Sequence, residues 1–303
     1  MFIGFDTSNY TTSVAVLDDR AIQAKKILSV KQGERGLRQS EAVFQHTVNM
    51  TALIESLDFR NIDAVGVSTR PRNVEGSYMP CFLVGEGIAS AVSHTNCVPL
   101  YRTSHQVGHI LASLYSEDKL DLINGKFIAF HLSGGTTEAL LVEPDKDELI
   151  RATVIAHSTD LKAGQAIDRA GVMMGLQFPC GKELDRLSSF SPEEYRIKPS
   201  MKGVNCSLSG VENKAKSMIE KGEPNENISK FVLSYISASI EEMLRRIIDE
   251  YGELPVVFSG GVSSNSLIRK NILNRYNAAY FAKPEYSLDN AVGVAVYAKI
   301  MNN

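Results

Sequence analysis

Two histidines four residues apart are the side chains of this sequence with the clearest capacity for chemistry. His105 and His109 lie in the segment TSHQVGHILAS. On a helix, this spacing places both imidazoles on one face, where they can bind one metal ion. Zinc proteases of the HExxH type need a glutamate after the first histidine, and that position is Gln106, so the sequence argues against protease chemistry. Two histidines that are only hydrogen-bonded at a helix start would give the same pattern. The spacing selects no third ligand among the many carboxylates.

A strand–turn–strand pattern that occurs twice supplies a second set of candidate residues. FIGFDTSNYTTSVAVL at residues 2–17 aligns without a gap with FIAFHLSGGTTEALLV at residues 127–142, and six positions are identical. Hydroxyl and backbone N–H groups in such turns bind phosphate oxygens. Ser, Thr and Gly are also common in ordinary hairpin turns, but two aligned copies favour ligand binding. The candidate residues are Thr7, Ser8, Ser133, Gly134, Gly135 and Thr136.

A third glycine-containing turn follows a buried strand near the C-terminus. In VVFSGGVSSN, Gly260 and Gly261 form the predicted turn, and Ser263 or Ser264 is expected to cap the helix that follows. A helix N-terminus after a glycine turn suits an anion or a nucleotide. Together with the duplicated hairpins, this turn is similar to the actin/Hsp70/sugar-kinase (ASKHA) fold, in which two related halves clamp ATP in a central cleft.

The elements around these motifs alternate between strands and helices, which predicts an α/β architecture with largely buried sheets. Strands are expected at 2–6, 13–17, 22–30, 63–69, 97–101, 126–133, 137–143 and 149–156, and a strand with a glycine turn at 254–261. Helices are expected at 37–58, 81–94, 105–115, 163–176, 182–189, 207–221, 227–251, 264–273 and 287–300. The polar segment SEDKLDLINGK (116–126) is the expected boundary, which gives halves at 1–122 and 123–303. The second half carries a helical insertion at about 160–225.

Composition limits the function classes. The chain has 303 residues and a net charge of −3, so a nucleic-acid partner would need a local basic patch. The four cysteines form no CxxC pair and no metal-binding spacing, which is typical of reduced thiols in a cytoplasmic protein. No apolar run reaches transmembrane length, and the first residues do not have the pattern of a signal peptide. We therefore expect a cytoplasmic protein without a membrane partner.

Several segments, in order over nearly the whole chain, resemble motifs of the TsaD/Gcp (glycoprotease) family. HQVGH is similar to the family's HxEGH, HLSGGTTEALLV to LVSGGHTxLxxV, and SGGVSSNSLIR to AGGVAANxxLR. STDLKAGQAIDRAGVMMGLQFPCGKELD is similar to TxDDAxGEAFDKxAxxLGLxYPGGPxxD, and SLDNAVGVA to TDNAAMIA. A fixed order of motifs is far more specific than any one of them.

The resemblance implies an activity and a set of ligands. Family members transfer threonylcarbamoyl from threonylcarbamoyl-adenylate to N6 of adenosine 37 in tRNA. The implied metal ligands are His105, His109 and Asp289, which would hold one divalent ion, iron or zinc. The implied contacts to the adenosine of ATP, ADP or an acyl-adenylate are Asp168, Gly181, Asp185 and Asn265. The implied partners are tRNA and either a TsaB-like subunit or a second copy of the chain.

The chain also departs from the family pattern at polar positions. The family's HxEGH glutamate is Val107 here, and its SGGHT histidine is Thr136. Other departures are Tyr10, Thr11, Leu161, Gln165 and Asn213. We therefore expect threonylcarbamoyl transfer to tRNA to be weak or absent without a partner, and the sequence assigns no catalytic residue. The alternatives are an ATP-binding paralogue with another acceptor and a non-catalytic, TsaB-like partner subunit. No nucleophile–base arrangement supports a peptidase.

Overall fold

A computed structural model of the chain describes residues 1–8, 10–29 and 37–303. Asn9 of the first turn and residue 30, at the end of the strand expected over 22–30, lie outside the described residues. The chain forms two compact units, the first comprising 1–123, 144–152 and 288–303, and the second 124–143 and 153–287. This division differs from a single cut after residue 122, because the C-terminal helix packs on the N-terminal sheet.

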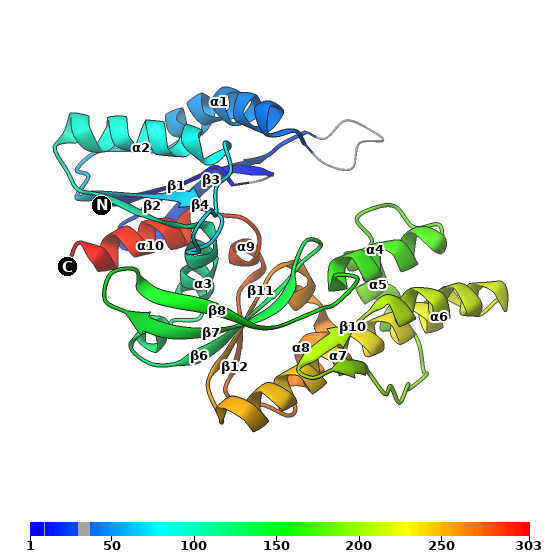
Figure 1. Cartoon of the computed structure of the whole chain (residues 1–303). Coiled ribbons are helices and arrows are strands. Elements are labelled where there is room, and N and C mark those ends of the chain that lie inside the picture. The colour runs from blue at the N-terminus through cyan, green and yellow to red at the C-terminus, as the bar shows by residue number, and fades with distance from the viewer. Residues whose placement is uncertain (9, 30–36) are drawn as a thin grey trace. The chain divides into compact units, whose positions relative to one another are not determined.

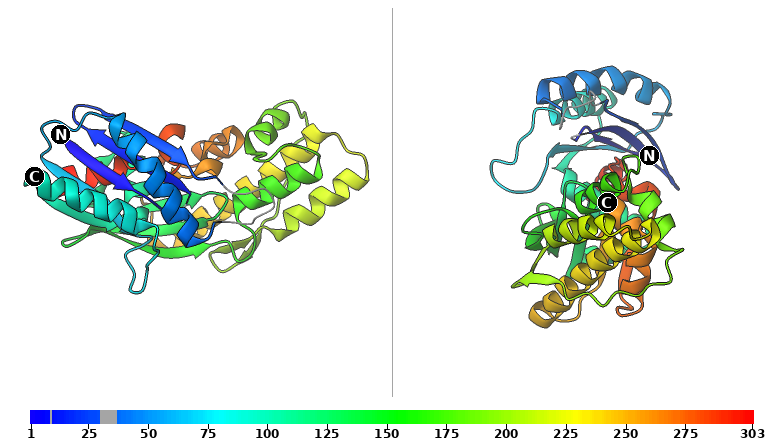
Figure 2. Two further views of the ribbon diagram at one scale, coloured as in Figure 1. Left: turned by 90° about the horizontal axis from the view of Figure 1, so that it is seen from above. Right: turned by 90° about the vertical axis from the view of Figure 1, so that its right-hand side faces the viewer.

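The first unit is built on a five-stranded sheet in the order β3-β2-β1-β4-β5. Its strands are β1 (Phe2–Asp6), β2 (Thr11–Leu17), β3 (Ala21–Ile27), β4 (Ala64–Arg70) and β5 (Leu100–Ser104). Its helices are α1 (Gln39–Glu55), α2 (Phe82–Asn96), α3 (His105–Ser116) and α10 (Val292–Met301), and the short 3-10 helix η1 (Leu120–Asn124) follows α3. Helices α1 and α2 lie over one face of the sheet and α10 lies on the other (Figures 1 and 2).

The second unit contains most of a sheet in the order β12-β11-β6-β7-β8 and a two-stranded sheet of β9 and β10. The end of β7 and the start of β8, within residues 144–152, belong to the first unit. The strands are β6 (Phe127–Leu132), β7 (Thr137–Asp145), β8 (Leu149–His157), β9 (Ser200–Lys202), β10 (Asn205–Ser207), β11 (Val256–Ser259) and β12 (Ala279–Phe281). The helices are α4 (Ala163–Met173), α5 (Gly181–Ser188), α6 (Ser209–Glu220), α7 (Asn225–Tyr251), the 3-10 helix η2 (Gly261–Ser264), α8 (Ser266–Leu273) and α9 (Pro284–Ser287).

Each unit has its own apolar core, which holds the strand ends in place. In the second unit, the ring of Phe258 stacks between those of Phe130 and Phe281, with centroid distances of 4.9 and 4.5 Å. In the first unit, Phe5 and Val67 are fully buried beside α2. Burying one such side chain contributes about 1.5–3 kcal/mol, so both sheets are rigid supports for the turns at their edges.

The duplicated hairpins are confirmed down to their register. Phe2 pairs with Leu17 in the first antiparallel hairpin, and Phe127 pairs with Val142 in the second. The two registers are therefore related by the same offset as the sequences. Within the described residues, no helix is long and apolar enough to cross a membrane.

Several element boundaries differ from the expectation. Neither Ser263 nor Ser264 caps α8, because Asn265 is its N-cap and accepts the N–H of Ile268 at 3.1 Å. The helix expected over 287–300 begins only at Val292. The strand expected at 97–101 begins at Leu100, because α2 extends to Asn96 and ends in the left-handed conformation of Cys97. The structure also contains short elements that were not expected from the sequence, namely η1, β9, β10, η2, β12 and α9.

Candidate metal centre and nucleotide-binding residues

The first turn of α3 carries both histidines. Strand β5 ends at Ser104, and the Ser104 hydroxyl caps the helix by accepting the N–H of Val107 at 3.2 Å. His105 is therefore the first helical residue, and His109 follows one turn later. Because a capped first turn has fixed backbone angles, the two imidazoles are held on one face of the helix.

Close packing between α3 and α10 brings a carboxylate to the histidines. A Cβ atom added to Gly293 would lie 1.8 Å from the Gly108 carbonyl oxygen, so the two helix backbones are in direct contact. Asp289 precedes α10, in a segment where the Asn290 side-chain oxygen accepts the N–H of Val292 at 3.0 Å. The packing of α3 against α10 therefore explains how Asp289 can lie beside His105 and His109, which are distant in sequence.

We expect Gly293→Ala to lower the free energy of unfolding by about 3 kcal/mol or more, because its methyl group would overlap the backbone of α3. Thermal and urea unfolding measure the effect. Gly87→Ala, in the exposed part of α2 with nothing within 4 Å of the added Cβ, is the matched control. It should be neutral or stabilise by up to about 1 kcal/mol. Equal stability of the two variants would contradict the close packing of α3 and α10.

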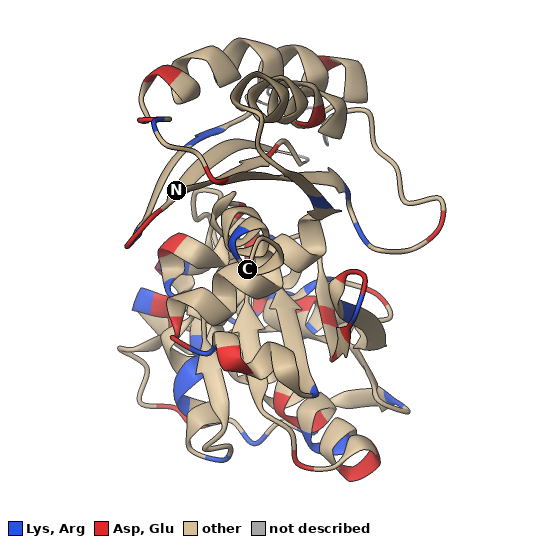
Figure 3. Cartoon of the chain, turned by 90° about the vertical axis from the view of Figure 1, so that its left-hand side faces the viewer, with Lys and Arg blue, Asp and Glu red and all other residues tan. Residues whose placement is uncertain are grey.

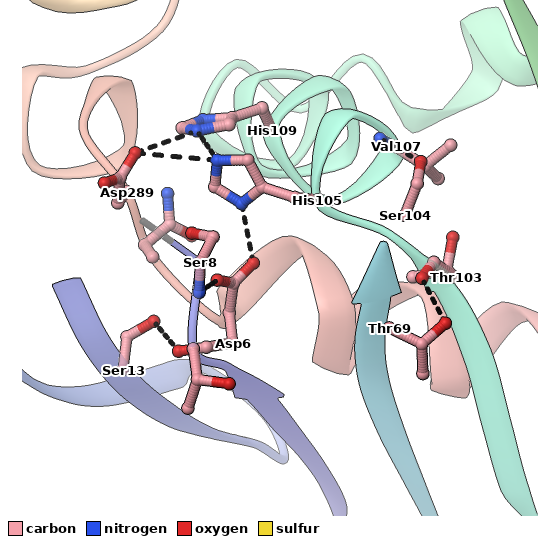
Figure 4. Close-up of polar contacts among 12 residues, drawn as sticks. Asp6, Ser8, Ser13, Thr69, Thr103, Ser104, His105, Val107, His109 and Asp289 are labelled. Carbon is pink, nitrogen blue, oxygen red and sulfur yellow. Dashed lines mark hydrogen bonds and ion pairs between the residues drawn. The ribbon is translucent and has the colours of Figure 1, made fainter. Parts of the chain in front are cut away.

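The ligand atoms of the three expected metal-binding residues all lie within 4.8 Å of one another (Figure 4). The Nε2 atoms of His105 and His109 are 3.0 Å apart. Asp289 Oδ1 lies 3.2 Å from His109 Nε2 and 3.7 Å from His105 Nε2. Two ligands that each lie about 2.0–2.2 Å from one ion are at most about 4.4 Å apart. The donor set therefore fits a single divalent ion, and imidazole with carboxylate suits iron or zinc.

A second carboxylate, which the sequence analysis did not select, lies behind the histidines. Asp6 Oδ2 is 2.8 Å from His105 Nδ1, and Asp6 is 1 % exposed. Burial alone would lower the pKa of His105, but the charges of Asp6 and Asp289 outweigh it and raise this pKa to about 9. Burial would raise the pKa of Asp6, but His105 and the Ser8 donors bring it below its ordinary value. The alignment of DTSNYTT with the family's ETSCDxT, which begins with an acid, was the available signal.

The candidate residues of the first hairpin turn are buried rather than open. The Thr7 hydroxyl donates to the Cys81 carbonyl oxygen at 2.9 Å and accepts the N–H of Gly85 at 3.1 Å. The Thr7 hydroxyl therefore links the first hairpin turn to the start of α2, and its contact with a phosphate stays a prediction. The Ser8 N–H donates to Asp6 Oδ1 at 2.8 Å. The Ser8 hydroxyl is buried and finds no partner within the described part of the chain.

The turn of the second hairpin is more open. Gly134 and Gly135 have free space around their Cα atoms. The Ser133 hydroxyl accepts the N–H groups of Gly135 and Thr136, at 3.3 and 3.1 Å. The start of α4 packs directly on this turn, because the Gly164 N–H donates to the Ser133 carbonyl oxygen at 3.1 Å. A helix N-terminus thus adjoins a glycine turn, which is an arrangement that favours anions.

The residues expected to contact adenosine are linked by hydrogen bonds within the second unit. Asp168 Oδ1 accepts the N–H of Cys180, which precedes Gly181, at 2.8 Å. Burial raises the pKa of Asp168, and this N–H partly offsets it. The Asp185 carboxylate accepts the N–H and the hydroxyl of Ser266, at 3.0 and 2.8 Å. The segment around Asp168, the segment from Gly181 to Asp185 and the segment around Asn265 are therefore adjacent.

The glycine turn before Asn265 also packs closely. Gly260 has φ of 89°, and a Cβ atom there would lie 2.3 Å from the Leu132 carbonyl oxygen at the end of β6. Gly261 begins η2 and is exposed. Asn265 is buried, and its side-chain oxygen caps α8. The NH₂ group of its side-chain amide is therefore the part that remains to contact a ligand.

With this geometry in view, comparison with known proteins identifies the family. Residues 22–296 match the TsaD family, described as tRNA N6-adenosine threonylcarbamoyltransferase. The chain belongs to this family. It is 28 % identical to the tRNA N6-adenosine threonylcarbamoyltransferase of Christiangramia forsetii, over 99 % of this chain and 93 % of that protein. It is 29 % identical to the enzyme of the same name from Thermosipho africanus, over 97 % and 92 % of the two chains.

One relative and two solved structures extend the comparison. A probable bifunctional tRNA threonylcarbamoyladenosine biosynthesis protein of Thermoplasma acidophilum is 23 % identical over 99 % of this chain and 56 % of its own length. Component A of (R)-2-hydroxyglutaryl-CoA dehydratase from Acidaminococcus fermentans has a TM-score of 0.58 at 14 % identity, covering 99 % and 98 % of the chains. A ROK hexokinase from Thermus thermophilus has a TM-score of 0.52 at 12 % identity, covering 100 % and 99 %. The actin/Hsp70/sugar-kinase fold expected from the sequence is confirmed.

Proposed function

We propose that this member of the TsaD family transfers a threonylcarbamoyl group from threonylcarbamoyl-adenylate to N6 of adenosine 37 in tRNA. The observation that carries the proposal is the meeting of His105, His109 and Asp289 at the contact between α3 and α10. Two imidazoles and one carboxylate leave coordination positions open for a substrate oxygen, which is typical of a catalytic rather than a structural centre. The names of the relatives from Christiangramia forsetii and Thermosipho africanus support the same activity.

In the proposed reaction, the N6 amine attacks the carbamoyl carbonyl of the acyl-adenylate. An N–C bond forms, the mixed-anhydride C–O bond breaks, AMP leaves and N6 loses one proton. A metal ion, iron or zinc, would supply Lewis-acid polarisation when it is bound by the three ligands. The chain's own residues bind and orient the substrate. The adenosine is bound by Asp168, Asp185 and Asn265, and the phosphate is bound by the turn at 133–136. Catalysis then depends on positioning.

Nucleotide binding is the part of this proposal that a single substitution tests. We expect Asp185→Ala to weaken ATP or ADP binding by about 1–3 kcal/mol, the range for hydrogen bonds to a charged group. Isothermal titration calorimetry measures the change. Because Asp185 also accepts two hydrogen bonds from Ser266, Ser266→Ala is the matched control. It removes the hydroxyl donor, keeps the carboxylate and should bind nearly as tightly as the wild type. Unchanged affinity of Asp185→Ala would count against the adenosine assignment.

We also propose a protein partner, either a TsaB-like subunit or a second copy of this chain. Phe44 and Val48 lie one turn apart on α1 and are 64 % and 57 % exposed. An exposed apolar pair at this spacing suits a helix face that a partner covers. Acidic and basic residues are interspersed over the chain (Figure 3), and the net charge is −3. A partner subunit would therefore help to provide the cationic surface that a tRNA needs.

The direct test is transfer by the purified chain together with its partner. The acyl-adenylate is supplied with a tRNA transcript that carries adenosine at position 37, and a transcript with guanosine there is the matched control. We expect modified adenosine only in the first. Nucleotide and metal binding without any tRNA modification would instead favour a paralogue with another acceptor, the alternative that Val107 and Thr136 support.

A further inference from the structure

The carboxylate of Asp6 is an unusual group to find at the end of a buried strand. Asp6 is the last residue of β1, and its side chain is 1 % exposed. Burying a carboxylate costs several kcal/mol unless charged or polar partners compensate. Its Oδ1 accepts the Ser8 N–H, and its Oδ2 faces His105 Nδ1 at 2.8 Å (Figure 4). The arrangement is therefore built around one ring nitrogen of His105.

This contact determines which nitrogen of His105 can bind a metal. An ionised carboxylate only accepts hydrogen bonds, so Nδ1 of His105 must donate its proton to Asp6. In the neutral ring, the lone pair is then on Nε2. Nε2 is the atom that lies 3.0 Å from His109 Nε2 and 3.7 Å from Asp289 Oδ1.

We propose that Asp6 is a positioning residue for the metal centre, which fixes His105 in the tautomer and ring orientation that direct Nε2 to the metal. Carboxylate partners of metal-binding histidines act in this way, and their loss weakens metal affinity. Asp6 also accepts the Ser13 hydroxyl, but through its backbone oxygen at 3.2 Å. The Asp6 carboxylate therefore contacts only the Ser8 N–H and the imidazole of His105 among the hydrogen bonds described above. The inference rests on the metal centre of the proposed function and does not depend on the acceptor substrate.

The substitution Asp6→Asn tests whether Asp6 positions His105 for the metal or only stabilises the fold. The amide keeps the size of the side chain, and its oxygen can still accept the Ser8 N–H. Its NH₂ group would then face His105 Nδ1, which would have to become an acceptor. The proton would move to Nε2 and block the metal-binding atom. We expect Zn²⁺ affinity to fall by about 10–100-fold, with little change in thermal stability in the presence of a chelator.

The measurement is competition for Zn²⁺ between the protein and a chromophoric chelator. Ser13→Ala is the matched control, because it removes a contact to the Asp6 backbone and keeps the carboxylate; its Zn²⁺ affinity should equal that of the wild type. Equal affinity of Asp6→Asn and wild type would overturn the positioning role. If the wild type itself binds no Zn²⁺, the metal centre of the proposed function fails instead.

A second measurement does not depend on the folding of the variant. In the Zn²⁺-loaded wild type with ¹⁵N-labelled histidine, we expect His105 to show a protonated, hydrogen-bonded Nδ1 and a metal-shifted Nε2. His105→Gln assigns the signal. Coordination through Nδ1, or a proton on Nε2, would overturn the inference.

Discussion

Replacing His109 with alanine should remove the bound metal ion and leave the fold intact. His109 is 4 % exposed, and its Nε2 lies within 3.2 Å of both His105 Nε2 and Asp289 Oδ1. Its loss leaves one imidazole and one carboxylate as ligands. Catalytic metal sites normally have three protein ligands, so two are too few to hold the ion stably. Asp289→Ala should have the same effect, because it removes the anionic ligand.

Metal analysis of the purified proteins after dialysis measures this effect, with circular dichroism as the folding control. His94→Ala is the matched histidine control. It lies in the last turn of α2, is exposed and is not part of the cluster, so it should retain wild-type occupancy. Full occupancy in His109→Ala would refute the assignment of the three ligands.

Transfer to tRNA should be about a hundredfold slower for the isolated chain than for the chain with the proposed partner subunit. Val107 and Thr136 replace a glutamate and a histidine of the family motifs, so the chain lacks two polar groups that the family motifs have. A misplacement of about 1 Å can lower a rate by about 10²-fold, and we expect partner binding to correct it. Initial rates, from mass spectrometry of digested tRNA, measure the difference.

Substitutions of Phe44 and Val48 on α1 provide the control for the stimulation of transfer by the partner. A variant with Phe44→Asp and Val48→Asp changes two surface side chains that are 64 % and 57 % exposed. It should keep the slow rate of the isolated chain and lose the stimulation. Fast transfer by the isolated chain would show that Val107 and Thr136 do not impair the reaction.

The hairpins were predictable because their pattern is local. Alternating apolar residues and a polar turn specify both strands, and the shared register of Phe2 with Leu17 and Phe127 with Val142 follows from the same spacing. Which of several neighbouring polar residues caps a helix was harder to predict. The sequence offers Ser263, Ser264 and Asn265 as caps in succession, and the 3-10 turn from Gly261 leaves only Asn265 at the start of α8.

The candidate metal centre was only partly predictable from the residues themselves. The spacing of His105 and His109 identified the pair, but Asp289 is 180 residues from His109. Only the resemblance to the TsaD family selected it, because the contact depends on two glycine backbones, Gly108 and Gly293, in direct packing. Asp6 was missed because its burial arises only when β1 is paired on both sides, with β2 and β4.

Complementation in a cell tests whether the chain transfers threonylcarbamoyl to tRNA. A strain that lacks its own threonylcarbamoyl transferase receives this chain with its partner subunit, and modified adenosine is quantified in bulk tRNA by mass spectrometry. We expect that the wild-type chain restores the modified nucleoside and that Asp289→Ala, expressed at the same level, does not. Absence of the modified nucleoside with a folded, metal-loaded wild-type chain and its partner, or full restoration by Asp289→Ala, would contradict it.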